Sequence, residues 1–199
     1  MDIKDISTNT DKLYTLRENE RCVFFMLNRS GDITFDLAGP GAEAHIVAFF
    51  IGKKDVKETL RITQRHSSFN TTSSASVKSA LFDESEFTYE GLIHIKEKAS
   101  GSKASQEARA LLVTPNTKAF FRPSLEILPE DVECRHAAAV SPLSKDALYF
   151  LKTRGISSEK AKKLLIEGFF KKDIEHIEDL GIKTNVLLSL LEKELKQAV

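Results

Sequence analysis

The sequence lacks an excess of charge of either sign. Its 199 residues include 29 lysines and arginines and 29 aspartates and glutamates, so the formal net charge is zero. Proteins that bind nucleic acids carry a basic footprint that covers the phosphates, and no strongly basic block stands out here. We therefore expect no nucleic-acid partner.

Long hydrophobic runs are also missing. No apolar stretch approaches the ~20 residues that a membrane-spanning helix needs, and the first ten residues, MDIKDISTNT, lack the apolar core of a signal peptide. We therefore expect no membrane partner and a soluble, cytoplasmic protein. The hydrophobic content of 41% is enough for a buried core.

Cysteine is scarce: Cys22 and Cys134 are the only two, and they lie far apart, outside any C-x-x-C spacing. One chain therefore cannot supply a four-thiolate zinc or iron–sulfur site by itself. A disulfide between the two is not expected in a reducing cytosol. The plainer interpretation is a pair of buried thiols, above all for Cys22. Nucleotide motifs are absent too, with no G-x-x-x-x-G-K-[ST] and no G-x-G-x-x-G after a strand, so we expect no intrinsic nucleotide site.

Short strand patterns fill the chain from Cys22 to about Val140, separated by turns rich in Gly, Asn, Ser and Pro. Similar strand–turn–strand units recur at roughly 20–25 residues, as in stacked repeats. Asn-Gly and Asp-Gly, the dipeptides that commonly close antiparallel hairpins, do not occur. The pattern favours a parallel β-helix, with a β-sandwich as the alternative.

We expect a β-helix core over residues 1–140 and a helical domain over residues 141–199. Residues 1–20 form either a frayed tail or an edge strand that covers the first rung. Unpaired sheet edges promote aggregation, and the helices after Ser141 are expected to cap one end of the β-helix. In this mainly β chain, helical spacing appears only after Ser141-Pro142.

Residues that favour helix ends divide the C-terminal segment. Ser144 is a good N-cap and Gly155 a good C′ residue for a first helix. A second helix is expected to start near Ser157 and to end at Gly168, and a further helical stretch follows it. The last helix, from about Thr184, is amphipathic with a broad leucine face that packs on its neighbours or binds a partner.

Seven short motifs follow one another in the order LAGPGAEA (37–44), HSSFNTTS (66–73), SQEARALL (105–112), LEI (125–127), DVECRHAA (131–138), ALYFLKTRGIS (147–157) and LLIEGF (164–169). The ordered set, which covers roughly residues 33–170, resembles the SufB/SufD family, the scaffold proteins of SUF iron–sulfur cluster assembly. The resemblance implies a right-handed parallel β-helix followed by a small C-terminal helical domain.

The resemblance also implies a function and partners. The chain would be a non-enzymatic scaffold whose helical end docks the ATPase SufC. Its β-helix would pair with SufB or with a second copy of the same chain. A transient iron–sulfur cluster would form at that pairing interface.

Two departures from the family pattern stand out. The SufB branch carries a cysteine in the glutamine-rich strand and a glutamate directly after the hinge histidine. Here the strand reads SQEAR (105–109) and Ala137 follows His136, so the chain resembles SufD. Family members usually also carry a long N-terminal region and further rungs ahead of the matched part. This N-terminally short chain is therefore either a reduced member or a fragment.

His136 and Cys134 are the candidate cluster-proximal groups or ligands. They are two residues apart, so a strand points both to the same face, and imidazole and thiolate both bind iron. The alternative is that both point into the β-helix core. For SufC binding, the resemblance points to Leu148, Leu151, Arg154, Gly155, Leu164, Leu165 and Phe169.

The other histidines are expected to be ordinary side chains. His66 would be a hydrogen-bonded stacking residue and not a ligand, His45 and His94 would be unremarkable strand residues, and His176 would be solvated. Two alternative functions stay open. One is a self-sufficient homodimeric scaffold that needs no SufB. The other is a β-helix carbohydrate enzyme, which would need convergent carboxylates that the neighbouring rungs do not present.

Overall fold

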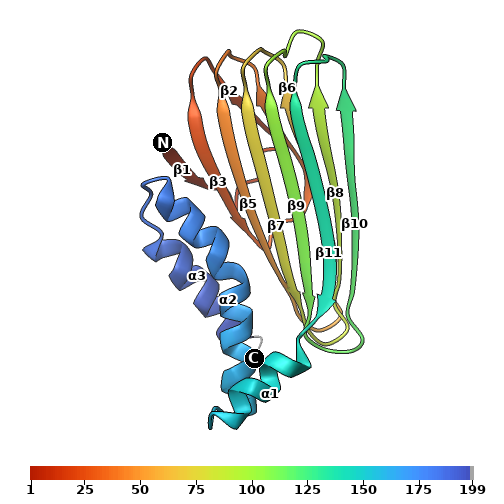
Figure 1. The fold of residues 1–199 in the computed structure, drawn as a ribbon, viewed down its shortest axis with the longest axis vertical. Coiled ribbons are helices and arrows are strands. Elements are labelled where there is room, and N and C mark those ends of the chain that lie inside the picture. Colours follow the sequence, from red (N-terminus) through yellow and green to blue (C-terminus); the bar gives the residue numbers. More distant parts are fainter. Residues whose placement is uncertain (198–199) are drawn as a thin grey trace.

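The computed structural model describes residues 1–197 and shows two parallel sheets wound into a β-helix, followed by three helices (Figure 1). The strands are β1 (Asp2–Asp5), β2 (Leu13–Leu16), β3 (Arg21–Leu27), β4 (Gly31–Leu37), β5 (Glu43–Gly52), β6 (Lys57–His66), β7 (Thr72–Leu81), β8 (Glu86–Ile95), β9 (Lys103–Leu112), β10 (Lys118–Ile127) and β11 (Glu133–Pro142). The helices are α1 (Lys145–Thr153), α2 (Ser158–Asp179) and α3 (Asn185–Lys196).

Successive strands alternate between the two sheets. The six-stranded sheet has the order β1-β3-β5-β7-β9-β11, the five-stranded sheet has the order β10-β8-β6-β4-β2, and all the pairings are parallel. Each turn of the chain therefore adds one strand to each sheet. The prediction of a parallel β-helix followed by helices is confirmed.

Most rungs are longer than the sequence pattern predicted. Arg21 contacts Glu43, 22 residues further on, within the expected 20–25. In later rungs the repeat is longer: His45 lies beside Ser74, 29 residues on, and Glu90 beside Arg122, 32 residues on. The predicted interval was wrong there because the strands of the later rungs are longer: β5 to β11 have 10 residues each, against 7 in β3 and β4.

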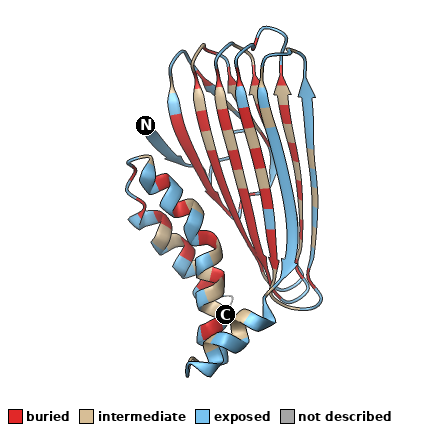
Figure 2. Ribbon diagram, in the orientation of Figure 1, coloured by how far each residue is buried: buried red, intermediate tan, exposed pale blue. Residues whose placement is uncertain are grey.

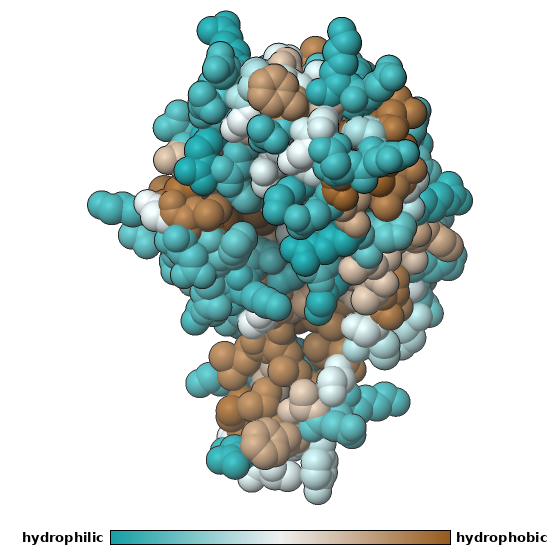
Figure 3. Space-filling view, turned by 45° about the horizontal axis from the view of Figure 1, so that its top comes forward, coloured by the Kyte–Doolittle hydropathy of each residue, from teal (hydrophilic) through white to brown (hydrophobic). Residues whose placement is uncertain are grey.

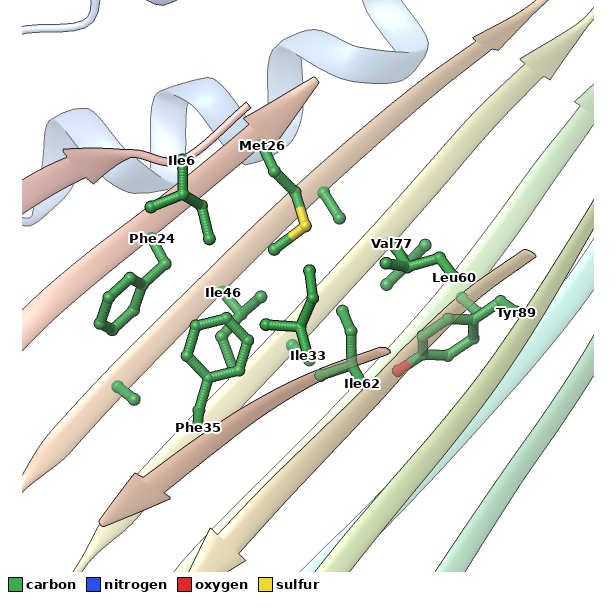
Figure 4. Close-up of a cluster of buried hydrophobic side chains, with 14 of the residues drawn as sticks. Ile6, Phe24, Met26, Ile33, Phe35, Ile46, Leu60, Ile62, Val77 and Tyr89 are labelled. Carbon is green, nitrogen blue, oxygen red and sulfur yellow. The ribbon is translucent and has the colours of Figure 1, made fainter. Parts of the chain in front are cut away.

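Side chains from successive rungs stack inside the β-helix, since paired residues of parallel strands in register point to the same side. At the N-terminal end this interior is filled by aromatic and aliphatic groups (Figure 4). The rings of Phe24 and Phe35, from the two facing sheets, lie 4.8 Å apart, and Tyr14 stacks on Phe35 at 5.4 Å. Burying each phenylalanine contributes about 2–3 kcal/mol.

Further along, the interior holds a polar network around His66. This fully buried side chain contacts the hydroxyls of Thr71 and Ser73 through its two ring nitrogens, at 2.7 Å and 2.8 Å. Burial lowers the pKa of His66 to about 4, so the ring is neutral near pH 7. The histidine joins neighbouring segments by hydrogen bonds, as the sequence indicated.

Residues 1–20 form the first rung. The short strands β1 and β2 pair with β3 and β4, and Ile6 and Leu16 are buried in the core. Of the two expectations for this segment, the edge strand is the one observed. Four-residue edge strands present few unpaired backbone groups, which limits uncontrolled edge pairing.

The helix ends follow the capping residues. The Ser144 hydroxyl accepts a hydrogen bond from the backbone N–H of Ala147, and Gly155 adopts a φ of +80° after α1. The expected end at Gly168 was wrong, because α2 continues through it to Asp179. Gly168 is exposed and its missing Cβ leaves only open space, so tertiary contacts of the flanking residues hold the helix together.

The expectation that the helices cap an end of the β-helix was wrong. Instead α2 and α3 fold back against the outer face of the six-stranded sheet, at its N-terminal strands (Figures 1 and 2). Outward side chains of β3 and β5, among them Phe25 and Phe49, form one apolar cluster with Phe170 of α2 and Leu191 of α3. Helices cover the sheet there because β3 and β5 are apolar on both faces.

Polar contacts also hold this helical pair on the sheet. The nearly buried Lys78 ammonium of β7 pairs with Asp173 at 3.0 Å and donates to the Phe169 carbonyl at 2.6 Å, both on α2. The Glu194 carboxylate of α3 accepts from Lys53 and Asn28, each at 3.2 Å. No helix within residues 1–197 is long and apolar enough to cross a membrane.

Candidate functional site

The last rung of the β-helix is uncovered. In the described chain β10 pairs only with β8 and β11 only with β9, so each strand leaves one backbone edge free. No residue of β10 or β11 is buried, whereas β3 and β5 are largely buried (Figure 2). The exposed apolar side chains near this end are Phe120, Leu125, Ile127, Leu128 and Val140. Free parallel edges beside apolar groups form a surface on which another chain can pair.

Cys134 and His136 share the inward face of this rung. The register places Cys134 above Ala104 and His136 above Gln106, and both of those partners are buried inside the β-helix. The prediction that the two side chains share one face is confirmed. Of the two orientations considered, the structure has the inward one. Because no further rung covers it, His136 is nevertheless exposed and Cys134 is only half-buried.

The surroundings of Cys134 favour a neutral thiol in the isolated chain. Its side chain packs against the buried cluster formed by Ile93, Ile95, Ala99 and Ala104. Burial raises the pKa of the Cys134 thiol, and a hydrogen bond with the Ala104 backbone opposes this in part. A thiolate ligand would therefore need an additional positive charge, such as a metal ion, to form at neutral pH.

Within residues 1–197, no group of three or more His, Cys, Asp or Glu side chains is arranged to hold a metal ion. The open rung offers one imidazole and one thiol on the same face. A cluster at this place would need further ligands from outside the described chain. Cys22, by contrast, is buried, and burial raises its pKa to about 11, in agreement with the structural role predicted for it.

The helical residues predicted to bind a partner fall into two groups. Arg154, Gly155 and Leu164 are exposed, whereas Leu148, Leu151 and Leu165 are half-buried. Phe169 packs on Phe170, with the Lys78 ammonium 5.2 Å from the centre of its ring, so its observed contacts are internal.

Sequence reasoning missed two exposed aromatic residues on α1. The Tyr149 side chain is 72% exposed and Phe150 is 55% exposed, and the Arg154 guanidinium lies 4.6 Å from the centre of the Phe150 ring. Figure 3 shows hydrophobic side chains gathered on the lower, helical part of the surface. Helical spacing predicts Leu148 and Leu151 as the contact residues of this helix. It does not show that the neighbouring Tyr149 and Phe150 are the more exposed side chains.

Sequence reasoning also missed the surroundings of His45. Its ring lies between Glu43 and Ser74 on the outer face of the six-stranded sheet, at 2.7 Å from each, and His176 of α2 approaches it. Glu43 and His45 are two residues apart on β5 and so share a face, whereas the register of β5 and β7 brings Ser74 beside His45. The contacts of His45 with Ser74 and His176 join distant parts of the chain, so no local motif in the sequence predicts them.

The fold and the open rung define a class: a parallel β-helix that is closed by helices along one side and can be extended at one end. The profile of the family described as "SUF system FeS cluster assembly, SufBD core domain" matches residues 27–169. The chain therefore belongs to the SufB/SufD family.

Curated relatives support this membership. The chain is 29% identical over 135 residues to the iron–sulfur cluster assembly protein SufB of Bacillus subtilis, covering 68% of this chain and 29% of that protein. It is 26% identical over 151 residues to SufD of Plasmodium falciparum, covering 75% and 10%. It is 29% identical over 136 residues to a SufBD family protein of Staphylococcus saprophyticus, covering 68% and 29%. The chain thus spans less than a third of the length of these relatives.

Proposed function

We propose that this chain is a scaffold subunit of SUF iron–sulfur cluster assembly that pairs through its open last rung. The supporting observation is the inward face of β11, where Cys134 and exposed His136 lie beside two free strand edges in a SufBD core domain. A second chain that adds strands there would cover the rung and bring its own ligands to the same place. The cluster is the cargo of this assembly and is held between two chains.

Pairing can be tested by placing a charge on the open rung. Val140→Asp puts a carboxylate on β11, and desolvating it against a partner strand would cost several kcal/mol. We expect wild type to pair, either with itself or with a co-expressed SufB-type protein, and the variant to pair at least tenfold more weakly. Light scattering after size-exclusion chromatography measures both cases.

Val56→Asp is the matched control, since Val56 is similarly exposed, at 41% against 45%, and lies outside the last rung. It should pair like wild type. Absence of pairing in wild type, or equal pairing of Val140→Asp, would contradict the proposal. The same experiment distinguishes a SufD-like subunit, which needs SufB, from a reduced scaffold that forms homodimers.

We further propose that His136 is the nearer group to the cargo and Cys134 the secondary one. His136 is exposed and can meet a partner without rearrangement, whereas Cys134 is half-buried with a raised pKa. His136→Ala should therefore lower the iron and sulfide content of the co-expressed assembly more than Cys134→Ala. His94→Ala on β8 is the control, and equal losses in all three variants would contradict these roles.

The helical segment is proposed to dock the ATPase SufC through α1 and the start of α2. The exposed pair Tyr149 and Phe150 supports this, because aromatic side chains beside an arginine are typical anchors of protein interfaces. Phe150→Ala should reduce co-purification with a SufC-type ATPase at least tenfold. Lys98→Ala, an exposed change in the turn between β8 and β9, should not. A Phe150→Ala variant that binds as well as wild type would exclude this surface.

A carbohydrate enzyme is not favoured by the electrostatics of the sheet faces. Glycoside hydrolysis needs a carboxylic acid with a raised pKa. Contacts with arginine, lysine or histidine instead lower the pKa values of the outward glutamates Glu43, Glu86, Glu90 and Glu133. We therefore retain the scaffold as the proposed function.

A further inference from the structure

A groove of about 600 Å³ lies between the outer face of the six-stranded sheet and the C-terminal half of α2. We call it the sheet–helix groove; the lining residues used below are His45, Ser74, Asp173 and His176. It is separate from the interior of the β-helix, because His45 and Ser74 belong to the outward-facing set of their strands. His136 of the last rung also lines the groove, but the SUF proposal above gives no role to His45 or His176.

The orientation of His45 is fixed from both sides of its ring. The Nε2 atom lies 2.7 Å from a Glu43 carboxylate oxygen, and the Nδ1 atom lies 2.7 Å from the Ser74 hydroxyl. Glu43 is itself anchored by the guanidinium of Arg21. A carboxylate that accepts the Nε2–H leaves the Nδ1 lone pair free to bind, which is how metal-ligating histidines are commonly held.

The second imidazole comes from α2. The His176 ring centre lies 6.2 Å from that of His45, with the ring planes 76° apart. A divalent ion about 2.1 Å from one nitrogen of each ring would place the two ring centres roughly 5–6.5 Å apart. The observed separation therefore leaves room for one ion between the rings, and the exposed His176 side chain can adjust its position.

The ligand type of the two rings indicates which ion would fit. The carboxylates of the groove lining do not add a strong bias, because Glu107, Asp173 and Glu175 each pair with an arginine or a lysine. Imidazole nitrogens select borderline divalent ions of the first transition series, among them Fe²⁺, Co²⁺, Ni²⁺ and Zn²⁺.

We infer that the sheet–helix groove binds one divalent transition-metal ion between His45 Nδ1 and His176. The ion replaces the hydrogen bond of His45 to Ser74, while Glu43 keeps its contact with Nε2. Within residues 1–197 no His, Cys, Asp or Glu side chain joins the two imidazoles as a third protein ligand. Water therefore fills the remaining coordination positions. The ion therefore links β5 to α2 and leaves open coordination positions facing the groove.

The test uses the full chain and two metal ions. Titration with Zn²⁺, followed by calorimetry, should give one binding site per chain, and Co²⁺ should give a visible absorption band that reports nitrogen ligands. His176→Gln, an exposed change, should weaken binding at least tenfold, and His45→Gln should do the same. Bound Zn²⁺ should also raise Tm in wild type, since it binds the folded state.

One control variant identifies the site. His94→Gln, on the other sheet, should bind Zn²⁺ like wild type. Absence of saturable binding in wild type, unchanged binding in His176→Gln, or an equal loss in His94→Gln would each overturn the inference. Pairing and SufC binding are read out separately, so failure of this site does not imply failure of the scaffold function.

Discussion

Strands β3 and β5 near the N-terminal end of the six-stranded sheet and its last strand, β11, share one backbone geometry but differ in what covers them. Strands β3 and β5 are buried on both faces, by the aromatic interior on one side and by α2 and α3 on the other. Strand β11 carries the run Ala137–Ala139 and has no buried residue. A strand covered on both faces has a continuous run of apolar residues, and β11 lacks such a run of large side chains. The composition of a strand therefore indicates how many of its faces are covered by other elements.

This difference suggests that one part of the β-helix stabilises the fold and another part binds a partner. The N-terminal rungs contain the large side chains and the helix contacts that hold the fold together. The last rung contributes little burial and leaves two strand edges free for a partner. We therefore expect substitutions in the first rungs to change unfolding and substitutions in the last rung to change pairing.

The largest expected effect is loss of an interior ring near the N-terminal end. Phe24→Ala should lower the free energy of unfolding by about 3–5 kcal/mol, because Phe24 is fully buried against Phe35 and the site cannot collapse fully. Urea unfolding followed by circular dichroism measures it. The control Phe69→Ala, in an exposed turn, should cost under about 1 kcal/mol; equal effects would show that the core does not lie where we place it.

The second prediction concerns pH and the closed interior. The pKa of His66 is about 4 in the folded state and about 6.5 in an unfolded chain, so the unfolded state binds the proton more strongly. Stability is then fully present above about pH 6.5 and falls as the pH drops toward about 4, by on the order of 3 kcal/mol. Urea midpoints between pH 7 and pH 4 measure this loss.

His66→Gln removes that titration while keeping hydrogen-bonding groups in the network. The variant should therefore show a flatter dependence of stability on pH than wild type over the same range. An unchanged slope would mean that His66 is not the group responsible.

The third prediction concerns the contact that holds the helices on the covered rungs. Lys78→Met removes the ammonium that pairs with Asp173 and caps the Phe169 carbonyl, and leaves a partly buried carboxylate without its cation. We expect a loss of about 2–3 kcal/mol and faster proteolysis after α1. Lys53→Met, at the more exposed pair with Glu194, should cost about 1 kcal/mol or less. If the two variants lose equal stability, the buried Lys78 pair does not contribute more than the exposed Lys53 pair.

The smallest expected effect lies at the open end. Phe120→Ala on β10 removes a ring that is 47% exposed, so unfolding of the isolated chain should change by about 0.5 kcal/mol or less. Pairing through the last rung should weaken measurably in the same variant. A large loss of stability without any loss of pairing would contradict the proposal that the last rung serves pairing and contributes little to stability.

Expectations based on local signals were largely right. Alternating and apolar stretches predicted the strand positions, and Ser144 and Gly155 predicted the ends of α1, since strand period and capping depend on residues near in sequence. The polar starts of strands such as β7 and β9 were missed. There, serine and lysine residues are as common in turns as in strands, and only the pairing of β7 with β9 shows that their backbone belongs to the sheet.

What the sequence by itself determined is the β-helix with a following helical segment, the family, and the common face of Cys134 and His136. Only the tertiary structure decided that α2 continues through Gly168, that the helices lie along the side of the β-helix, and that the last rung stays open. It also brought His45 beside His176. The physical reason is that these features depend on contacts between residues distant in the chain, whose burial outweighs local preference.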